Sequence, residues 1–213
     1  MCDQDHFEQD REEYEALGLV TRRQFGAILG AGVAMMLPAV VNAVAVTESE
    51  VNIMTPDGTA DCYFVHPATG AAAGVIVWPD IFGLRPAMRQ MGKRLAENGY
   101  SVLVVNPFYR IKKAPAIEDP STFSFQNPSD MAKLQPLMAS IGAPGAAEKD
   151  AAAFVAWLDQ QPQVNKAKKI GTQGYCMGGP LVVRTAAAVR KAIGPPMQYP
   201  CVPIFRFLAT DGC

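Results

Sequence analysis

The sequence predicts an α/β fold in which a mainly parallel sheet is covered by helices on both faces. Short apolar runs typical of fully buried strands alternate with segments of helical periodicity, and no internal repeat is present. The chain has 213 residues, of which 49% are hydrophobic and 18% charged, which suits a single folded core. Its formal net charge of −1 gives no electrostatic reason to expect a nucleic-acid partner.

The first half of the domain begins with a predicted hairpin. Residues 51–56 alternate weakly, residues 56–58 form a Pro-Asp-Gly turn, and residues 61–66 are expected to form the second strand. The short apolar run at 74–79 predicts a buried strand. A helix should follow from Pro86, because its apolar residues fall at helical spacing until a glycine ends it at position 99.

The second half continues the alternation of strands and helices. Residues 101–105 predict another buried strand, and the Pro-rich stretch 106–144 is expected to be irregular except for a short helix near 131–140. An alanine-rich helix is expected over 146–160. A strand over 168–174 then leads into a helix from Pro180 to about residue 192, with proline tolerated in its first turn.

Residues 1–43 have the pattern of an export leader. A polar segment is followed by Thr21-Arg22-Arg23-Gln24-Phe25 and then by a chargeless stretch, rich in Gly and Ala, that ends at Thr47. Small residues up to Ala43 suit signal peptidase. The pattern resembles a twin-arginine signal, which implies the twin-arginine export machinery and a bacterial periplasmic location for residues 44–213. An uncleaved membrane anchor is the alternative, since the stretch is about long enough to span a bilayer.

A candidate nucleophile lies in Gly174-Tyr175-Cys176-Met177-Gly178-Gly179, between a predicted strand and a predicted helix. A Gly-x-nucleophile-x-Gly pattern in that position forms a sharp elbow that exposes the central side chain, and the glycines avoid collisions with the strand and helix. The helix that follows points free N–H groups and its positive dipole end at the sulfur, which favours a thiolate. A buried structural cysteine in a tight turn is the alternative interpretation.

With this elbow and the segments 75–83 and 104–110, the chain resembles the dienelactone hydrolase family of α/β hydrolases over about residues 50–190. The resemblance implies that Cys176 is the nucleophile and that the backbone N–H groups of Met177 and Ile81 form the oxyanion hole. It implies hydrolysis of a small-molecule lactone or ester.

Two further site residues follow from the resemblance. Asp80 stands where the family commonly has a glutamate that pairs with the resting nucleophile, and it is one methylene shorter. Arg110 falls near a family arginine that binds the substrate carboxylate, after a one-residue gap in the local alignment. An ordinary surface arginine is the alternative for Arg110.

Metal and cofactor chemistry are not indicated. The five cysteines include no CxxC motif and no Cys/His cluster at metal-ligand spacing, so no metal ligand and no cofactor are expected. The sequence gives no indication of the oligomeric state.

The pattern breaks after the elbow, so the α/β-hydrolase fold is expected to be incomplete at its C-terminal side. In α/β hydrolases the acid and the histidine follow the nucleophile in the chain. After Cys176 this chain has one carboxylate, Asp211, and no histidine, and residues 191–213 form an atypical Pro-rich tail. A truncated or frame-shifted product would give this pattern, and a natural short homologue is the rival explanation.

His66 precedes the core strands, in a hairpin expected at the sheet edge, and we interpret it as a surface or turn histidine rather than a replacement base. Without a histidine base, deacylation should be slow, and activity is expected to be low. Two other functional classes stay open at this point: a non-catalytic binding protein that keeps the hydrolase pocket, and a serine-type esterase or acyltransferase relative, which Cys176 in place of serine disfavours.

Overall fold

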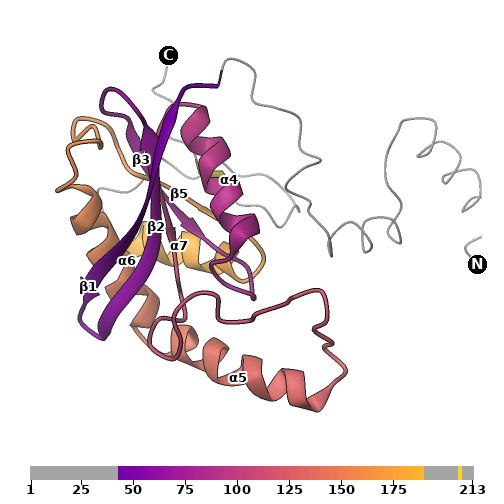
Figure 1. The fold of residues 1–213 in the computed structure, drawn as a ribbon. Helices are drawn as coiled ribbons and strands as arrows, with labels where there is room; N and C mark the ends of the chain where they lie inside the picture. Colours follow the sequence, from indigo (N-terminus) through magenta and orange to yellow (C-terminus); the bar gives the residue numbers. More distant parts are fainter. Residues whose placement is uncertain (1–42, 190–205, 208–213) are drawn as a thin grey trace, which may run out of the picture. The chain divides into compact units, whose positions relative to one another are not determined.

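The structure is a computed structural model, and it describes residues 43–189 and the backbone of 206–207. All of these residues belong to one compact unit, 39–213 (Figure 1). The strands are β1 (Val46–Thr55), β2 (Gly58–Pro67), β3 (Ala73–Trp78), β4 (Tyr100–Val105), β5 (Gly171–Gly174) and β6 (Arg206–Phe207); the helices are α4 (Pro86–Glu97), α5 (Pro128–Gly142), α6 (Ala146–Leu158) and α7 (Gly178–Ala188).

The strands form one sheet in the order β1-β2-β4-β3-β5-β6. β3 lies between β4 and β5 and pairs with both in parallel. The pairs β1–β2, β2–β4 and β5–β6 are antiparallel. The α/β fold is therefore confirmed, but the sheet is mixed rather than mainly parallel, because the N-terminal hairpin pairs with β4 in the opposite direction.

Helices cover both faces of the sheet, as the alternation of side chains along the central strands requires. On one face Val75, Val77 and α4 belong to one apolar cluster. On the other face Ile76 and Trp78 belong to a larger cluster with residues from α5, α6 and α7. Figure 1 shows α4 on one side of the strands and α6 and α7 on the other.

The hairpin, the two buried strands and the helices after β3 and β5 form at the predicted places, but β1, β2 and α5 are longer than expected. β5 is shorter than the predicted 168–174, and α7 ends at Ala188 rather than near residue 192. β1 begins at Val46, five residues before the expected start at Val51. Helix α5 spans 15 residues, in a stretch for which only a short helix was predicted. Its start is marked by Asn127, whose side chain accepts a hydrogen bond from the N–H of Ser129, and by a proline in the first turn.

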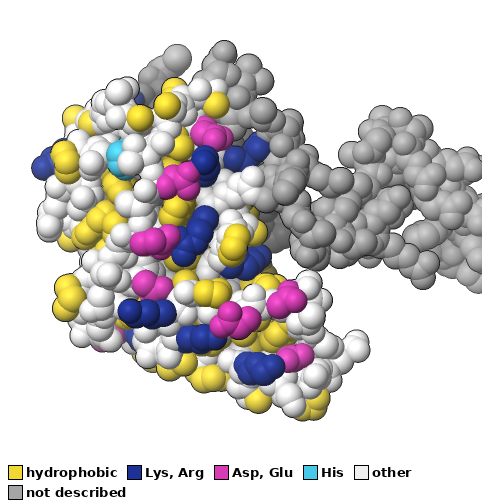
Figure 2. Space-filling model, viewed as in Figure 1, with side chains coloured by type: hydrophobic (Ala, Val, Ile, Leu, Met, Phe, Trp, Pro, Cys, Tyr) yellow, Lys and Arg dark blue, Asp and Glu magenta, His cyan; other side chains and the backbone are white. Residues whose placement is uncertain are grey.

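The proposed leader and the atypical tail lie outside the described residues, apart from Ala43 and the short strand β6. Within the part of the chain that is described, no helix is both long and apolar enough to cross a membrane. Lys, Arg, Asp and Glu side chains are interspersed on the face in Figure 2, without a patch of one sign.

Candidate active site

The predicted nucleophile lies at a sharp turn between β5 and α7. Cys176 is exposed and unpaired, and its φ of 51° is the only positive φ of a non-glycine residue among those described. A backbone held in this region is strained and is found most often at functional sites. The chain turns into the helix at once: the N–H of Gly178 donates to the carbonyl of Tyr175 at 2.8 Å, and the N–H of Gly179 to that of Cys176 at 2.9 Å.

The flanking glycines are required by close backbone contacts. A Cβ on Gly174 would lie 2.2 Å from the carbonyl oxygen of Gly178, and a Cβ on Gly178 would lie 2.3 Å from that of Trp78. Because both neighbours are backbone atoms, neither can move without displacing the strand or the helix. This close packing supports the interpretation of the Gly-x-Cys-x-Gly string as a nucleophile elbow.

The elbow lies directly against the end of β3. The N–H of Tyr175 donates to the carbonyl of Trp78 at 3.2 Å, and a Cβ on Gly178 would approach the carbonyl of Pro79 to 2.7 Å. The loop that carries Ile81 therefore leaves the sheet beside the first turn of α7, where Met177 occupies the N-cap position. The two expected oxyanion donors thus come from neighbouring segments on the same edge of the sheet.

A buried hydrogen bond joins the same two elements behind the elbow. The indole Nε1 of Trp78 donates to Oγ1 of Thr185 at 3.0 Å, and both side chains are fully buried. Thr185 Oγ1 in turn donates to the carbonyl of Leu181 at 2.7 Å. The sequence analysis missed this contact because its partners are 107 residues apart.

Asp80 forms an ion pair within its own loop. Its Oδ1 and Oδ2 accept from Nη1 and Nη2 of Arg85 at 2.7 and 2.8 Å, and Oδ1 also accepts from the N–H of Phe82 at 3.0 Å. Arg85 donates further to the carbonyl of Gly83 at 3.2 Å. The structure thus gives the Asp80 carboxylate a partner, Arg85, that the sequence analysis did not consider.

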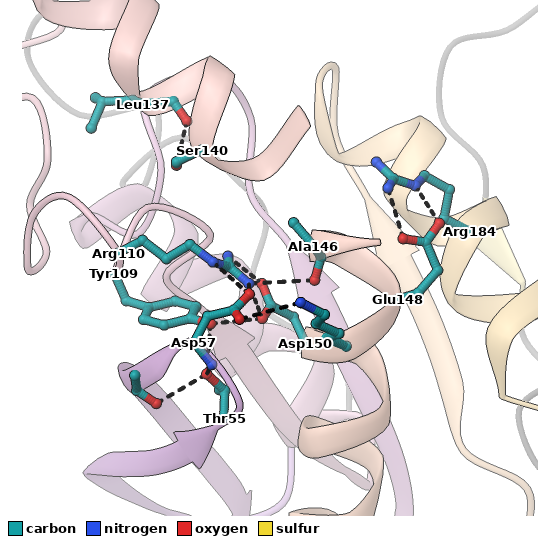
Figure 3. Close-up of polar contacts among 12 residues, drawn as sticks. Thr55, Asp57, Tyr109, Arg110, Leu137, Ser140, Ala146, Glu148, Asp150 and Arg184 are labelled. Carbon is teal, nitrogen blue, oxygen red and sulfur yellow. Dashed lines mark hydrogen bonds and ion pairs between the residues drawn. The ribbon is translucent and has the colours of Figure 1, made fainter. Parts of the chain in front are cut away.

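Arg110 lies in a polar network at the turn of the β1–β2 hairpin (Figure 3). Its guanidinium donates to Asp57 at 2.8 Å and to both carboxylate oxygens of Asp150 at 2.7 and 2.8 Å. Tyr109 donates to Asp150 at 2.8 Å and also contacts Thr55. The hairpin turn is three or more strand positions from β5, so this guanidinium lies on the order of 15 Å from the elbow.

The electrostatics of this network follow from burial. Desolvation raises the pKa of the fully buried Asp150 carboxyl, against the hydrogen bonds from Arg110 and Tyr109 that lower it. Burial disfavours the charge on Arg110, but hydrogen bonds to Asp150 and Asp57 outweigh this cost and raise its pKa. The guanidinium therefore stays charged and is already matched by two carboxylates.

His66 and Cys176 lie at opposite ends of the strands, His66 level with the start of β4 and Cys176 just beyond the end of β5. His66 is a mostly buried residue of β2, not a surface or turn residue as expected, and its Nδ1 is 2.8 Å from the carbonyl oxygen of Pro67. Its neighbour Val65 pairs with Val102 near the start of β4, whereas β5 ends at Gly174 beside Trp78. From the usual strand spacings, His66 and Cys176 are on the order of 20 Å apart, too far for proton transfer.

A cavity of about 510 Å³ also opens at the His66 end of the strands. It is lined by residues 44–45, 67–69, 71–73, 98–100 and 168, most of them small. Because it lies far from the strained cysteine and holds no cluster of reactive side chains, we assign the site to the elbow.

Three phenylalanines that the sequence analysis did not select form a cluster beside the Ile81 loop. The ring centroids of Phe82 and Phe123 are 5.4 Å apart, and those of Phe123 and Phe125 are 5.1 Å apart, both in edge-on arrangements. Phe125 is 57% exposed. The sequence does not predict this cluster, because the contact of Phe123 and Phe125 with Phe82 depends on the fold of the 106–127 loop.

Comparison with known proteins decides the family. A model of the dienelactone hydrolase family matches residues 60–203, which include the elbow and the Ile81 loop. The chain belongs to this family. The match reaches residue 203, further than the resemblance predicted from sequence alone.

Curated relatives agree with the family match. The chain is 25% identical over 147 residues to a carboxymethylenebutenolidase of Pseudomonas putida, with 68% of this chain and 58% of the relative covered. It is 28% identical over 133 residues to a carboxymethylenebutenolidase of Rhodococcus opacus, with 62% and 46% covered. The chain therefore spans about half the length of the curated relatives it matches.

Solved structures show the same fold. A crystal structure from Klebsiella pneumoniae that bears the dienelactone hydrolase name superposes with a TM-score of 0.55 at 21% identity, covering 70% of this chain and 57% of that one. A dienelactone hydrolase-like promiscuous phosphotriesterase from metagenomic libraries gives a TM-score of 0.52 at 22% identity, covering 67% and 54%. At these identities the likeness concerns the fold alone.

Proposed function

We propose that this chain is a thiol hydrolase of lactones or carboxylic esters, with Cys176 as the nucleophile. The observation that carries the proposal is the exposed cysteine at φ 51° between β5 and α7. A strained, solvent-accessible thiol at the start of a helix is the arrangement in which this family's fold presents a nucleophile. Membership of a family that contains carboxymethylenebutenolidases supports a lactone or ester as substrate.

In the proposed reaction, the Cys176 thiolate attacks the carbonyl carbon of the ester. The thiol first gives its proton to solvent; the carbon–sulfur bond then forms, the carbon–oxygen bond breaks as the intermediate collapses, and the leaving alkoxide takes a proton from solvent. The N–H groups of Ile81 and Met177 would stabilise the negative oxygen of the tetrahedral intermediate. The contact of Gly178 with the backbone after β3 supports this role, because it brings the two donor segments together.

Completion of the cycle needs a base, and no histidine lies at the elbow among the residues that the structure describes. The two histidines are His6, which lies outside the described residues, and His66, on the order of 20 Å from Cys176. No general base is therefore available from His66 to activate water against the thioester. We propose that these 213 residues acylate and stall, with turnover reduced on the order of 10⁴-fold or more relative to an intact triad.

Burst kinetics test this proposal. The full chain is mixed with excess p-nitrophenyl acetate, whose leaving group needs no protonation, and nitrophenolate release is followed beside Cys176→Ala. We expect one equivalent of release per chain, an acetyl group on Cys176 by mass spectrometry, and almost no steady state. Cys62→Ala is the matched control, since Cys62 is buried. Absence of acylation would favour the non-catalytic binding protein, and sustained turnover would reveal another base.

We also propose that residues 1–43 direct export to the bacterial periplasm through the twin-arginine machinery. The support is the sequence Thr21-Arg22-Arg23-Gln24-Phe25 ahead of a chargeless stretch. Replacing Arg22 and Arg23 with lysine should leave the protein unprocessed inside the cell. Arg11→Lys, in the same polar segment, should be exported normally. Export of the double variant at the wild-type level would refute the proposal.

A further inference from the structure

In the described part of the chain, Arg110 and Arg85 are both already neutralised by carboxylates. Arg110 is opposed by Asp57 and Asp150, and Lys149 completes the network at 3.4 Å from Asp57. Two cations and two carboxylates leave no net charge there. A substrate carboxylate would have to displace Asp57, face the fully buried Asp150, and reach a group on the order of 15 Å from the elbow.

Arg85 is the basic residue closest in sequence to the expected oxyanion donor, four positions after Ile81. Both of its terminal nitrogens are bound by the carboxylate of Asp80, and these two side chains are only 16% and 19% exposed. The guanidinium also lies over the ring of Phe82, 5.6 Å from its centroid. Its positive charge is therefore neutralised by Asp80 within the loop, and the guanidinium is not free to bind an anionic substrate.

The Phe82–Phe123–Phe125 cluster provides apolar surface beside the loop that carries Ile81. Phe82 follows Ile81 directly, so the cluster begins one residue beyond the expected oxyanion donor. The other two rings are held by local bonds: the N–H of Ser124 donates to Asp130 at 3.2 Å and that of Asn127 to the carbonyl of Ser124 at 3.0 Å. Phe125 keeps more than half of its surface in water.

From these observations we infer that the site takes uncharged esters or lactones with an apolar group beside the reacting carbonyl, and that Phe82, Phe123 and Phe125 bind that group. The inference rests on the proposed function, because it names the substrate class of the same cysteine. Aromatic faces and edges bind apolar and aromatic groups in water, whereas a carboxylate beside them would lose hydration, and Arg85 and Arg110, already paired with carboxylates, would not compensate it.

The test compares three activated esters on the full chain: p-nitrophenyl acetate, p-nitrophenyl phenylacetate and the mono-p-nitrophenyl ester of glutaric acid. The second-order rate constant of the burst is measured for each. We expect phenylacetate to acylate Cys176 at least tenfold faster than the glutarate ester. In Phe125→Ala the ratio of phenylacetate to acetate rates should fall roughly five- to tenfold. Met54→Ala, another exposed apolar residue, should keep the wild-type ratio.

Each outcome has a distinct meaning. The inference is overturned if the glutarate ester reacts fastest, or if the phenylacetate-to-acetate ratio is unchanged in Phe125→Ala. In either case acylation by acetate would leave the proposed thiol hydrolase standing. If none of the three esters acylates Cys176, the proposed function itself fails, and the inference with it.

Discussion

Asp80 and Arg85 form a bidentate ion pair inside the loop that follows β3, with N···O distances of 2.7 and 2.8 Å. Because Asp80 also accepts the N–H of Phe82, and Arg85 donates to the carbonyl of Gly83, the pair closes the loop on itself. Ile81 lies between these anchors. The pair thus fixes the backbone that would present the Ile81 N–H to an oxyanion.

Breaking this pair should slow acylation of Cys176 without changing the fold. In Arg85→Gln the loop loses its ion pair, and we expect the limiting acylation rate to fall on the order of tenfold. Complete removal of an oxyanion donor costs more than this, and here the Ile81 N–H is only displaced. Apparent affinity for the ester should change little. Arg85→Lys should recover part of the rate, because it restores the charge but not the bidentate geometry.

The control for the loop is Arg89→Gln, on the same side of the molecule but in α4, where the guanidinium pairs with the exposed Glu50. Its acylation rate should equal that of the wild type. An Arg85→Gln protein with an unchanged limiting rate would show that Asp80 and Arg85 do not position the loop.

Local steric rules explain which parts of the site could be predicted. The elbow could be predicted because Gly174 is required by a contact within five residues, with the backbone of Gly178, whereas the contact of Gly178 with the backbone of Trp78 depends on the fold. The start of α5 is also determined locally, because Asn127 followed by proline is a common helix N-terminus; the sequence analysis did not use it. The Asp80–Arg85 pair joins residues five positions apart in a loop, where no helical or strand period indicates which side chains meet.

Contacts between distant segments could not be predicted in the same way. Arg110 binds Asp57 and Asp150, which are 53 and 40 residues away in the sequence, and only the fold brings the hairpin turn and α6 together. The direction of the hairpin relative to β4 has the same origin, since alternation along a strand does not specify its neighbour. His66 was misjudged because its burial depends on this pairing.

The elbow glycines should not tolerate alanine. Gly174→Ala places a Cβ 2.2 Å from a backbone oxygen, so strand and helix must separate, and we expect loss of at least 2–3 kcal/mol of stability together with loss of thiol acylation. Urea denaturation and burst amplitude measure the two effects. Gly142→Ala is the matched control: nothing lies within 4 Å of the added Cβ, and stability should be unchanged or slightly raised. A stable, reactive Gly174→Ala protein would contradict the elbow geometry.

Removing the buried carboxylate of Asp150 should destabilise the fold strongly. Asp150→Ala leaves Arg110, 13% exposed, without its buried partner, and the loss of one member of such a pair typically costs about 3–5 kcal/mol. Lys149→Ala, at the preceding position of α6, removes only a contact at 3.4 Å from an exposed side chain and should cost less than about 0.5 kcal/mol. Similar urea midpoints for the two variants would show that the network is not structural.

The pair of Glu148 and Arg184 joins α6 to α7, the helix that follows the elbow, with both N···O distances at 2.7 Å (Figure 3). Hydrogen bonding to Arg184, opposed by desolvation, lowers the pKa of Glu148 below its ordinary value of 4.5. A carboxyl whose folded pKa is depressed stabilises the fold above its unfolded pKa, and that contribution is lost as the pH falls through the folded pKa. The effect of this pair should therefore be full at pH 7, begin to fade near pH 4.5, and be lost as the pH falls further through the folded pKa.

Glu148→Gln should accordingly lower the free energy of unfolding by about 0.2–1 kcal/mol at pH 7, the range for a partly exposed ion pair. The difference from wild type should shrink as the pH falls below about 4.5, because protonation of Glu148 leaves both proteins with a neutral side chain at position 148. Urea denaturation at four pH values measures it, with Glu118→Gln as the control, since that side chain is 77% exposed and should contribute little at any pH. A Glu148→Gln difference that stays constant down to pH 3 would mean that the charge of Glu148 does not stabilise the α6–α7 contact.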